Sequence, residues 1–270
     1  MIHYLSPHPC LAKSIDYYWV GEPGDEAIKV LPDGSASIIL SFGDQIGYKN
    51  HRGEETIVDH NLLIGPHTKF YFINRKNTNT VIGIKFKKGG LYHLINESID
   101  KYHDAIVPLE QAYDQEIARL MEGLKTCNKT DEIKKSLNKY FFLKVTTKSK
   151  SSDKIDFALK ALEISSNEGS IQEISEQLDI TNKHLITLFR EKVGLTPKQI
   201  HRLNKFNAVL KLIMDKKNQS WPSIAFACNY YDQAHLINEF KSFSGWSPTQ
   251  YLQLSPENED QNILTALTNS

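Results

Sequence analysis

The chain has 270 residues, of which 40% are hydrophobic and 24% charged, and its formal net charge is zero. This length favours two domains, and this composition is typical of a globular protein that buries a core. The charge does not indicate a nucleic-acid binder, since residues 150–254 hold 13 lysine and arginine residues against 11 acidic ones. Three scattered cysteines, no signal-peptide pattern and no apolar run of about 20 residues predict a soluble cytoplasmic protein with free thiols.

The first third of the chain is predicted to be β-structure. Apolar runs at 26–31 and 35–42 flank Pro32-Asp33-Gly34, whose residue types favour a tight turn and predict a hairpin. Further short apolar runs follow at 56–58, 62–64, 70–73 and 80–86. Short strands at this spacing predict a small, cupin-like β-barrel or sandwich.

Helical periodicity replaces this pattern after Gly90. A short helix is expected at 91–95, and apolar stripes predict helices over 117–124 and 133–141. These helices either pack on the barrel or form a dimer interface. The apolar-free segment 146–153 predicts a linker. We therefore expect a sensor or dimerisation domain at 1–145, an all-α domain at 154–256 and a flexible tail at 257–270.

The all-α part contains an internal repeat. Residues 170–200 align with 220–251, at an offset of 50 in the first helix (Ile174 with Ile224) and of 51 in the second (Phe189 with Phe240). Each unit reads as a short helix, a turn and a longer amphipathic helix, which is the pattern of a helix-turn-helix. The residues after the two isoleucines are small, Ser175 and Ala225, as a close helix crossing requires.

A helix predicted over 197–216 joins the two units. At ~1.5 Å per residue it would be roughly 30 Å long, and successive major-groove faces of B-DNA lie ~34 Å apart. One chain could therefore present two recognition helices to the same side of a duplex.

This repeat resembles the AraC/XylS DNA-binding domain over about 100 residues. Matching positions include Ile174, Arg190, Gly194 and Pro197 in the first unit, and their counterparts in the second are Ile224, Lys241, Gly245 and Pro248. The resemblance implies a sequence-specific, DNA-binding transcription regulator that is not an enzyme. Its expected partners are double-stranded DNA, a small-molecule effector and RNA polymerase, with no membrane and no cofactor. Both a monomer and a homodimer are open.

The resemblance also implies the contacts with DNA. Base edges are expected to be read by Asn182, Lys183, Thr187, Gln233 and Asn238, and phosphates to be held by Thr181, Arg190, Lys198, Asp232 and Lys241. Thr187 and Asn238 stand where the family usually has arginine, which removes side chains suited to guanine or phosphate. Asn229-Tyr230 replaces the family's Gly-Phe turn, and Asn tolerates the left-handed region.

The N-terminal part resembles one AraC-type subgroup through Leu31-Pro32-Asp33-Gly34, Gly65-Pro66, the stretch 83–90 and Pro108-Leu109-Glu110. An effector pocket lined by Tyr17, Trp19, Phe70 and Phe72 is one interpretation, and an ordinary aromatic core is the other. His51, His60 and His67 lack the His-x-His pair of a metal-dependent cupin enzyme, so no metal site is predicted.

The alternative function is a sensor or interaction module whose degenerate helix-turn-helix domain binds DNA weakly. The near-neutral charge and the absence of both arginines support this alternative.

Overall fold

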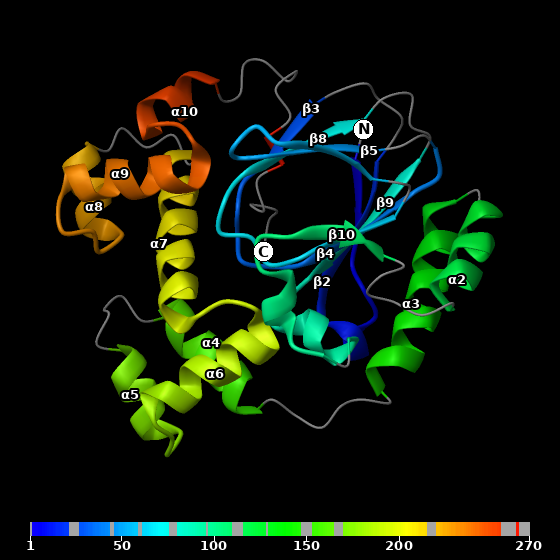
Figure 1. Cartoon of the computed structure of the whole chain (residues 1–270), viewed down its shortest axis with the longest axis horizontal. Coiled ribbons are helices and arrows are strands. Elements are labelled where there is room, and N and C mark those ends of the chain that lie inside the picture. The colour runs from blue at the N-terminus through cyan, green and yellow to red at the C-terminus, as the bar shows by residue number, and fades with distance from the viewer. Residues whose placement is uncertain are drawn as a thin grey trace.

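The computed structural model describes residues 2–21, 27–43, 46–58, 61–75, 80–95, 97–109, 116–127, 129–146, 153–164, 170–214, 220–254 and 263–264. It has an N-terminal part built on antiparallel sheets and a C-terminal part built of helices, as Figure 1 shows. The predicted two-domain α+β class is therefore confirmed. The predicted linker at 146–153 lies almost wholly outside the described residues.

The larger sheet has six antiparallel strands. In spatial order they are β1 (Ile2–Leu5), β2 (Ile15–Gly21), β9 (Val81–Phe86), β4 (Ser37–Ser41), β7 (Asn61–Ile64) and β10 (Ile106–Pro108). The central strands β4 and β9 are buried on both faces and read as continuous apolar runs, since helices cover one side and the second sheet the other.

The smaller sheet has five strands. Their order is β11 (Ile263–Leu264), β3 (Ala27–Val30), β8 (Tyr71–Arg75), β5 (Ile46–Asn50) and β6 (Glu55–Val58). All pairs are antiparallel except β11 with β3. The rest of the predicted tail at 257–270 lies outside the described residues.

The two sheets form a sandwich and not a closed barrel within the part of the chain that the structure describes. One apolar cluster joins them, with Ile39, Leu62 and Ile64 from the larger sheet and Tyr71 and Ile73 from the smaller one. The prediction had left barrel and sandwich open, and the pairing decides for the sandwich.

Pro32-Asp33-Gly34 does not close a hairpin. Gly34 has the expected positive φ of 79°, but β3 before the turn belongs to the smaller sheet and β4 after it to the larger one. The turn carries the chain from one sheet to the other. The prediction of a hairpin was wrong, because turn residues specify a local bend and not the partners of the strands that follow.

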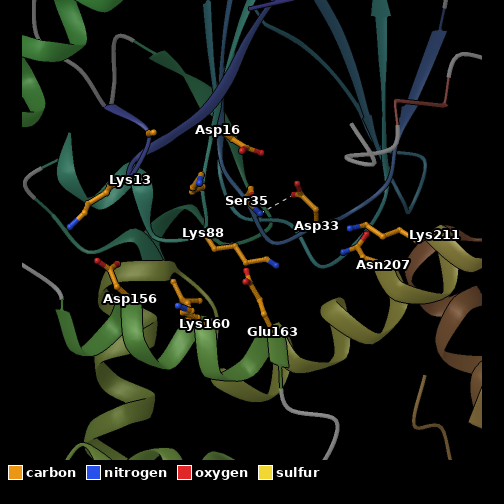
Figure 2. Close-up of a pocket in the computed structure, with 13 residues that line it drawn as sticks. Lys13, Asp16, Asp33, Ser35, Lys88, Asp156, Lys160, Glu163, Asn207 and Lys211 are labelled. Atoms are coloured by element: carbon orange, nitrogen blue, oxygen red, sulfur yellow. Dashed lines mark hydrogen bonds between the residues drawn. The ribbon is translucent and has the colours of Figure 1, made fainter. Parts of the chain in front are cut away.

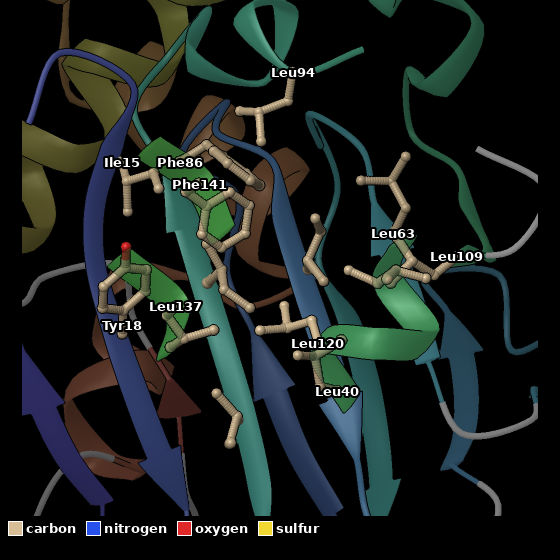
Figure 3. Packing of buried hydrophobic residues seen from close by; sticks show 14 of the residues in the cluster. Ile15, Tyr18, Leu40, Leu63, Phe86, Leu94, Leu109, Leu120, Leu137 and Phe141 are labelled. Carbon is tan, nitrogen blue, oxygen red and sulfur yellow. The ribbon is translucent and has the colours of Figure 1, made fainter. Parts of the chain in front are cut away.

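The predicted helices after the sheet pack on it. A 3₁₀ turn, η2, spans Gly90–His93, a second, η3, spans Ile99–Tyr102, and α2 (Glu116–Lys125) and α3 (Thr130–Thr146) follow. In Figure 3 Leu137 and Phe141 of α3 lie over Tyr18 and Phe86 of the sheet. The Tyr18 hydroxyl donates a hydrogen bond of 3.1 Å to Asn138 Oδ1. Packing on the sheet, one of the two alternatives for these helices, is thus confirmed.

In the C-terminal part, all described elements between residues 153 and 254 are helices. Its helices are α4 (Asp153–Ile164), α5 (Ser170–Gln177), α6 (Asn182–Val193), α7 (Pro197–Met214), α8 (Trp221–Ala227), α9 (Gln233–Ser244) and α10 (Pro248–Leu254). They share one hydrophobic core, at whose centre Phe206 of α7 lies 5.1 Å, centroid to centroid, from both Phe240 and Phe243. Among the described helices, none is long and apolar enough to span a membrane.

Candidate nucleic-acid interface and interdomain cavity

The turns of the two repeat units have the same hydrogen-bond pattern. Asp179 and Asn229, which are 50 residues apart, both have positive φ, of 51° and 56°. The residue after each donates its backbone N–H to the small residue of the first helix, Ile180 to the carbonyl of Ser175 at 3.0 Å and Tyr230 to that of Ala225 at 2.9 Å. The expectation that Asn229 supplies the left-handed turn is confirmed, and an aspartate does the same in the first unit.

The second helix of each unit starts at a side-chain cap. The Thr181 hydroxyl oxygen accepts a hydrogen bond of 3.2 Å from the backbone N–H of His184, and the Asp232 carboxylate accepts one of 2.7 Å from that of His235. Each cap satisfies a backbone donor that a helix leaves unpaired at its N-terminus. The negative Asp232 would repel a phosphate, so of these two residues only Thr181 retains a phosphate contact in our proposal.

The remaining predicted contact residues lie on the outer faces of α6 and α9 and at the start of α7. Seven of them are exposed, and Gln233 is half-buried. The exposed residues are Asn182, Lys183, Thr187, Arg190, Lys198, Asn238 and Lys241. The opposite faces are buried through Leu185 and Phe189 in α6 and Leu236 and Phe240 in α9. The helix-turn-helix scaffold thus fixes which side of each second helix meets solvent.

Both second helices end against the N-terminal domain. A Cβ on Gly194, which caps α6 with a φ of 82°, would lie 2.8 Å from Ile99 Cγ2. A Cβ on Gly245, the equivalent cap of α9, would lie 2.6 Å from Phe70 Cε1. Because both C-termini face the N-terminal domain, the N-terminal ends of both helices point away from it, as Figure 1 shows.

A buried lysine connects this domain to the second unit. Lys29 Nζ lies 3.1 Å from the ring centroid of Trp246 and 3.9 Å from that of Phe70. Lys29 is only 5% exposed, and this burial lowers its pKa to about 7. The aromatic faces favour the ammonium form and act against that shift.

The four aromatic residues of the predicted effector pocket do not line one cavity. Tyr17 and Trp19 border a space of about 60 Å³ between the sheets. Phe70 and Phe72 lie instead beside Lys29, at the contact with the second unit. The space between the sheets has room for only a few water molecules.

A larger cavity of about 610 Å³ lies between the domains (Figure 2). Its walls are mostly charged, and it is lined by Ala12, Lys13, Asp16, Asp33, Ser35, Lys87 and Lys88 of the N-terminal domain and by Asp156, Leu159, Lys160, Glu163, Asn207 and Lys211 of the helical domain. Its lining comes from segments far apart in the sequence. No motif pointed to it, although Lys88 and Asp33 belong to the motif stretches of the N-terminal resemblance.

Lys88 lies where the two walls meet. Its Nζ donates a hydrogen bond of 2.7 Å to Asn204 Oδ1 across the domain boundary. Burial lowers the pKa of Lys88, and burial raises the pKa of Asp16 on the same wall. A second lysine, Lys85, pairs with Asp33 at 2.8 Å. The cavity therefore combines a half-buried ammonium with carboxylates on the same wall.

The comparisons with known proteins agree with this geometry. A family model described as a helix-turn-helix domain matches residues 174–254, and one described as a domain of unknown function (DUF6597) matches residues 3–108. Residues 174–254 are a helix-turn-helix domain of the AraC/XylS type. This match supports a DNA-binding transcription regulator. No curated protein sequence matches the chain.

Several solved structures are similar to this chain at low identity. A structure of ToxT from Vibrio cholerae is 12% identical with a TM-score of 0.48, over 88% of this chain and 97% of that one. A probable AraC family regulator from Rhodopseudomonas palustris is 15% identical with a TM-score of 0.35, over 38% and 97%. The DNA-binding domain of AdpA, in complex with a target DNA, is 17% identical with a TM-score of 0.32, over 38% and 89%.

Proposed function

We propose that this protein is a sequence-specific DNA-binding transcription regulator whose two recognition helices are α6 and α9. The observation that carries the proposal is the common orientation of the two units: both helices are capped at their exposed N-terminal ends and anchored to the N-terminal domain at their C-terminal ends. In this arrangement both reading ends can approach one side of a duplex.

The proposed contacts divide by position along each helix. Asn182, Lys183 and Thr187 in α6, with Gln233 and Asn238 in α9, are proposed to read base edges. Arg190 and Lys241 lie late in their helices and are proposed to hold phosphates, with Thr181 and Lys198. The Thr187 hydroxyl donates to the carbonyl of Lys183 at 3.0 Å, so its methyl group is the part available to a thymine methyl.

Selection of bound sequences from a random duplex pool tests this function. Gln233→Ala should relax the preference at one base position and cost on the order of 1–3 kcal/mol on the selected site. Lys241→Gln should weaken the selected and random duplexes alike. No enrichment of any sequence by the wild-type protein would contradict the proposal.

We further propose that the interdomain cavity binds the effector. Fatty acid is bound in one structure of ToxT, but the cavity here is lined mainly by charged groups, which favour a small polar acid over an aliphatic chain. A ligand that contacts Lys88 and Lys211 from opposite walls would change how the helical domain sits on the N-terminal domain. A ligand at a concentration of a hundred times its Kd raises the free energy of unfolding by about 2.7 kcal/mol.

A library of small organic acids, screened by thermal denaturation, tests the effector site. Ligands that stabilise the wild type should fail to stabilise Lys211→Glu, whose exposed side chain borders the cavity. Lys139→Glu, an exposed lysine on α3, is the matched control and should respond like the wild type. A ligand that stabilises Lys211→Glu fully would place the effector elsewhere.

The second candidate function is an interaction module with weak DNA affinity. It is supported by Thr187 and Asn238 in place of arginines. Under this alternative the wild-type protein shows no preference for any sequence, so the same selection experiment separates the two functions.

A further inference from the structure

One face of the connecting helix α7 is basic and points away from the N-terminal domain. A Cβ on Gly34 would lie 3.2 Å from Ile200 Cδ1 and 3.1 Å from Leu203 Cδ1, and Asn204 accepts the hydrogen bond from Lys88. These positions therefore define the side that faces the N-terminal domain. Lys198 and Lys205, seven residues apart, lie two turns from each other on another face of the helix. That face is on the side to which the reading ends of α6 and α9 point.

A groove of about 290 Å³ separates this face from the second recognition helix. It is lined by Lys198, His201, Arg202, Lys205, His235 and Glu239. The first four residues come from α7, and the last two lie one turn apart on α9. The groove thus lies between the connecting helix and the second recognition helix, and it holds three permanent cations against one carboxylate.

The carboxylate of Glu239 forms an ion pair with Arg202. Glu239 Oε2 accepts a hydrogen bond of 2.8 Å from Arg202 Nε, and its Oε1 accepts one of 2.6 Å from Nη2. Partial burial alone would raise the pKa of Glu239, but the hydrogen bonds and charge of Arg202 lower it. Glu239 thus occupies the two guanidinium N–H groups of Arg202 that could otherwise donate to a phosphate.

The two lysines supply the rest of the groove's positive charge. Lys205 Nζ donates to the carbonyl of Asn229 and lies 4.4 Å from the ring centroid of Tyr230, which holds it beside the turn of the second unit. Within the part of the chain that the structure describes, Lys198 forms no ion pair and is exposed.

We propose that this groove binds the phosphate backbone of the DNA between the two recognition helices, and that Glu239 limits the affinity by occupying Arg202. The inference rests on the proposed DNA-binding function. Lys198 and Lys205 each hold one phosphate. The connecting helix is therefore part of the interface and not only a spacer. It gathers positive charge on one face, although the net charge of the whole chain is zero.

Salt titrations of duplex binding test the lysines. Lys198→Gln/Lys205→Gln should flatten the slope of log affinity against log salt by about two on the selected and random duplexes alike, since each phosphate contact contributes ~0.9. Lys135→Gln/Lys139→Gln, two exposed lysines on α3, removes the same charge away from the groove and should leave the slope unchanged. Equal slopes for these two variants would overturn the groove assignment.

Glu239→Gln tests the role of the carboxylate. It keeps the side-chain shape and releases the positive charge of Arg202, so the slope should steepen by about one and both duplexes should bind more tightly. Weaker binding by a variant that melts like the wild type would overturn this role.

Loss of the proposed function and loss of the groove assignment give different binding results. A wild-type protein that binds neither duplex removes the proposed function and the groove together, whereas wild-type binding with unchanged slopes in all variants removes only the groove. Inorganic phosphate, titrated without DNA, identifies the remaining source of the same chemistry. If phosphate stabilises the wild type but not Lys198→Gln/Lys205→Gln, and the DNA slopes are equal, the groove binds a free anion and not DNA.

Discussion

Gly245→Ala measures how firmly the second helix-turn-helix unit is docked on the N-terminal domain. Gly245 has a φ of 77°, and an alanine there costs about 1–2 kcal/mol for the left-handed backbone alone. Its Cβ would also lie 2.6 and 2.8 Å from two ring carbons of Phe70, which belongs to the other domain. Overpacking of this kind costs typically about 1–3 kcal/mol. The expected loss is therefore about 2–5 kcal/mol in the free energy of unfolding, measured by urea denaturation.

Two further variants separate the backbone cost from the domain contact. Gly53→Ala is a control, because Gly53 has a φ of 87° but a Cβ there meets only Lys49 Cε, at 3.8 Å; it should lose about 1–2 kcal/mol. In a Phe70→Ala background the ring is gone, and Gly245→Ala should cost no more than this control. If Gly245→Ala costs the same with and without the Phe70 ring, the second unit does not dock at this site and the reasoning is refuted.

Four other predictions follow from the same structure. Thr187→Arg should raise the affinity for DNA in anisotropy titrations, because it adds a guanidinium at the exposed face of α6. An unchanged affinity would contradict the docking of this helix in the major groove of DNA. Asp104→Asn should cost about 1–3 kcal/mol at pH 7, since the carboxylate accepts two hydrogen bonds from Thr68. Burial alone would raise the pKa of Asp104, but the hydrogen bonds from His103 and Thr68 lower it. The stabilisation by the carboxylate is therefore present above about pH 4 and is lost as the pH falls further. Denaturation at pH 7 and pH 3 should show that the difference in unfolding free energy between wild type and variant shrinks. Gly34→Val should lower the melting temperature, because its Cβ would lie 3.1 Å from Leu203 Cδ1 at a positive φ; an unchanged value would contradict the contact. Limited proteolysis should cut first within 146–153, and early cuts elsewhere would contradict the proposed linker.

The repeat and its turns could be predicted from sequence because their rules are local. Apolar spacing places Leu185 and Phe189 on one helix face whatever the rest of the chain does. A small residue at a helix crossing and a turn residue that accepts positive φ each act over a few positions. The one surprise within the repeat, Asp179 in the left-handed turn, follows the same rule as Asn229.

The sheet was only partly predictable. The strands β3, β4, β6, β7, β8 and β9 coincide with the predicted apolar runs, whereas β1, β2, β5, β10 and β11 were not predicted. β2 carries the mixed run Ile15–Gly21, in which buried and half-buried residues do not alternate cleanly. Its strand character depends on pairing with β9, about 65 residues away, and such pairing has no local signature.

The sequence by itself determined that the chain carries two helix-turn-helix units and which face of each second helix is buried. Only the tertiary structure decided where the charged side chains act. Lys88 and Lys211, or Arg202 and Glu239, look like ordinary surface residues along the chain. They become a cavity and a groove because separate elements bring them together, and a charged side chain gives no sign of its partner until the opposing wall is in place.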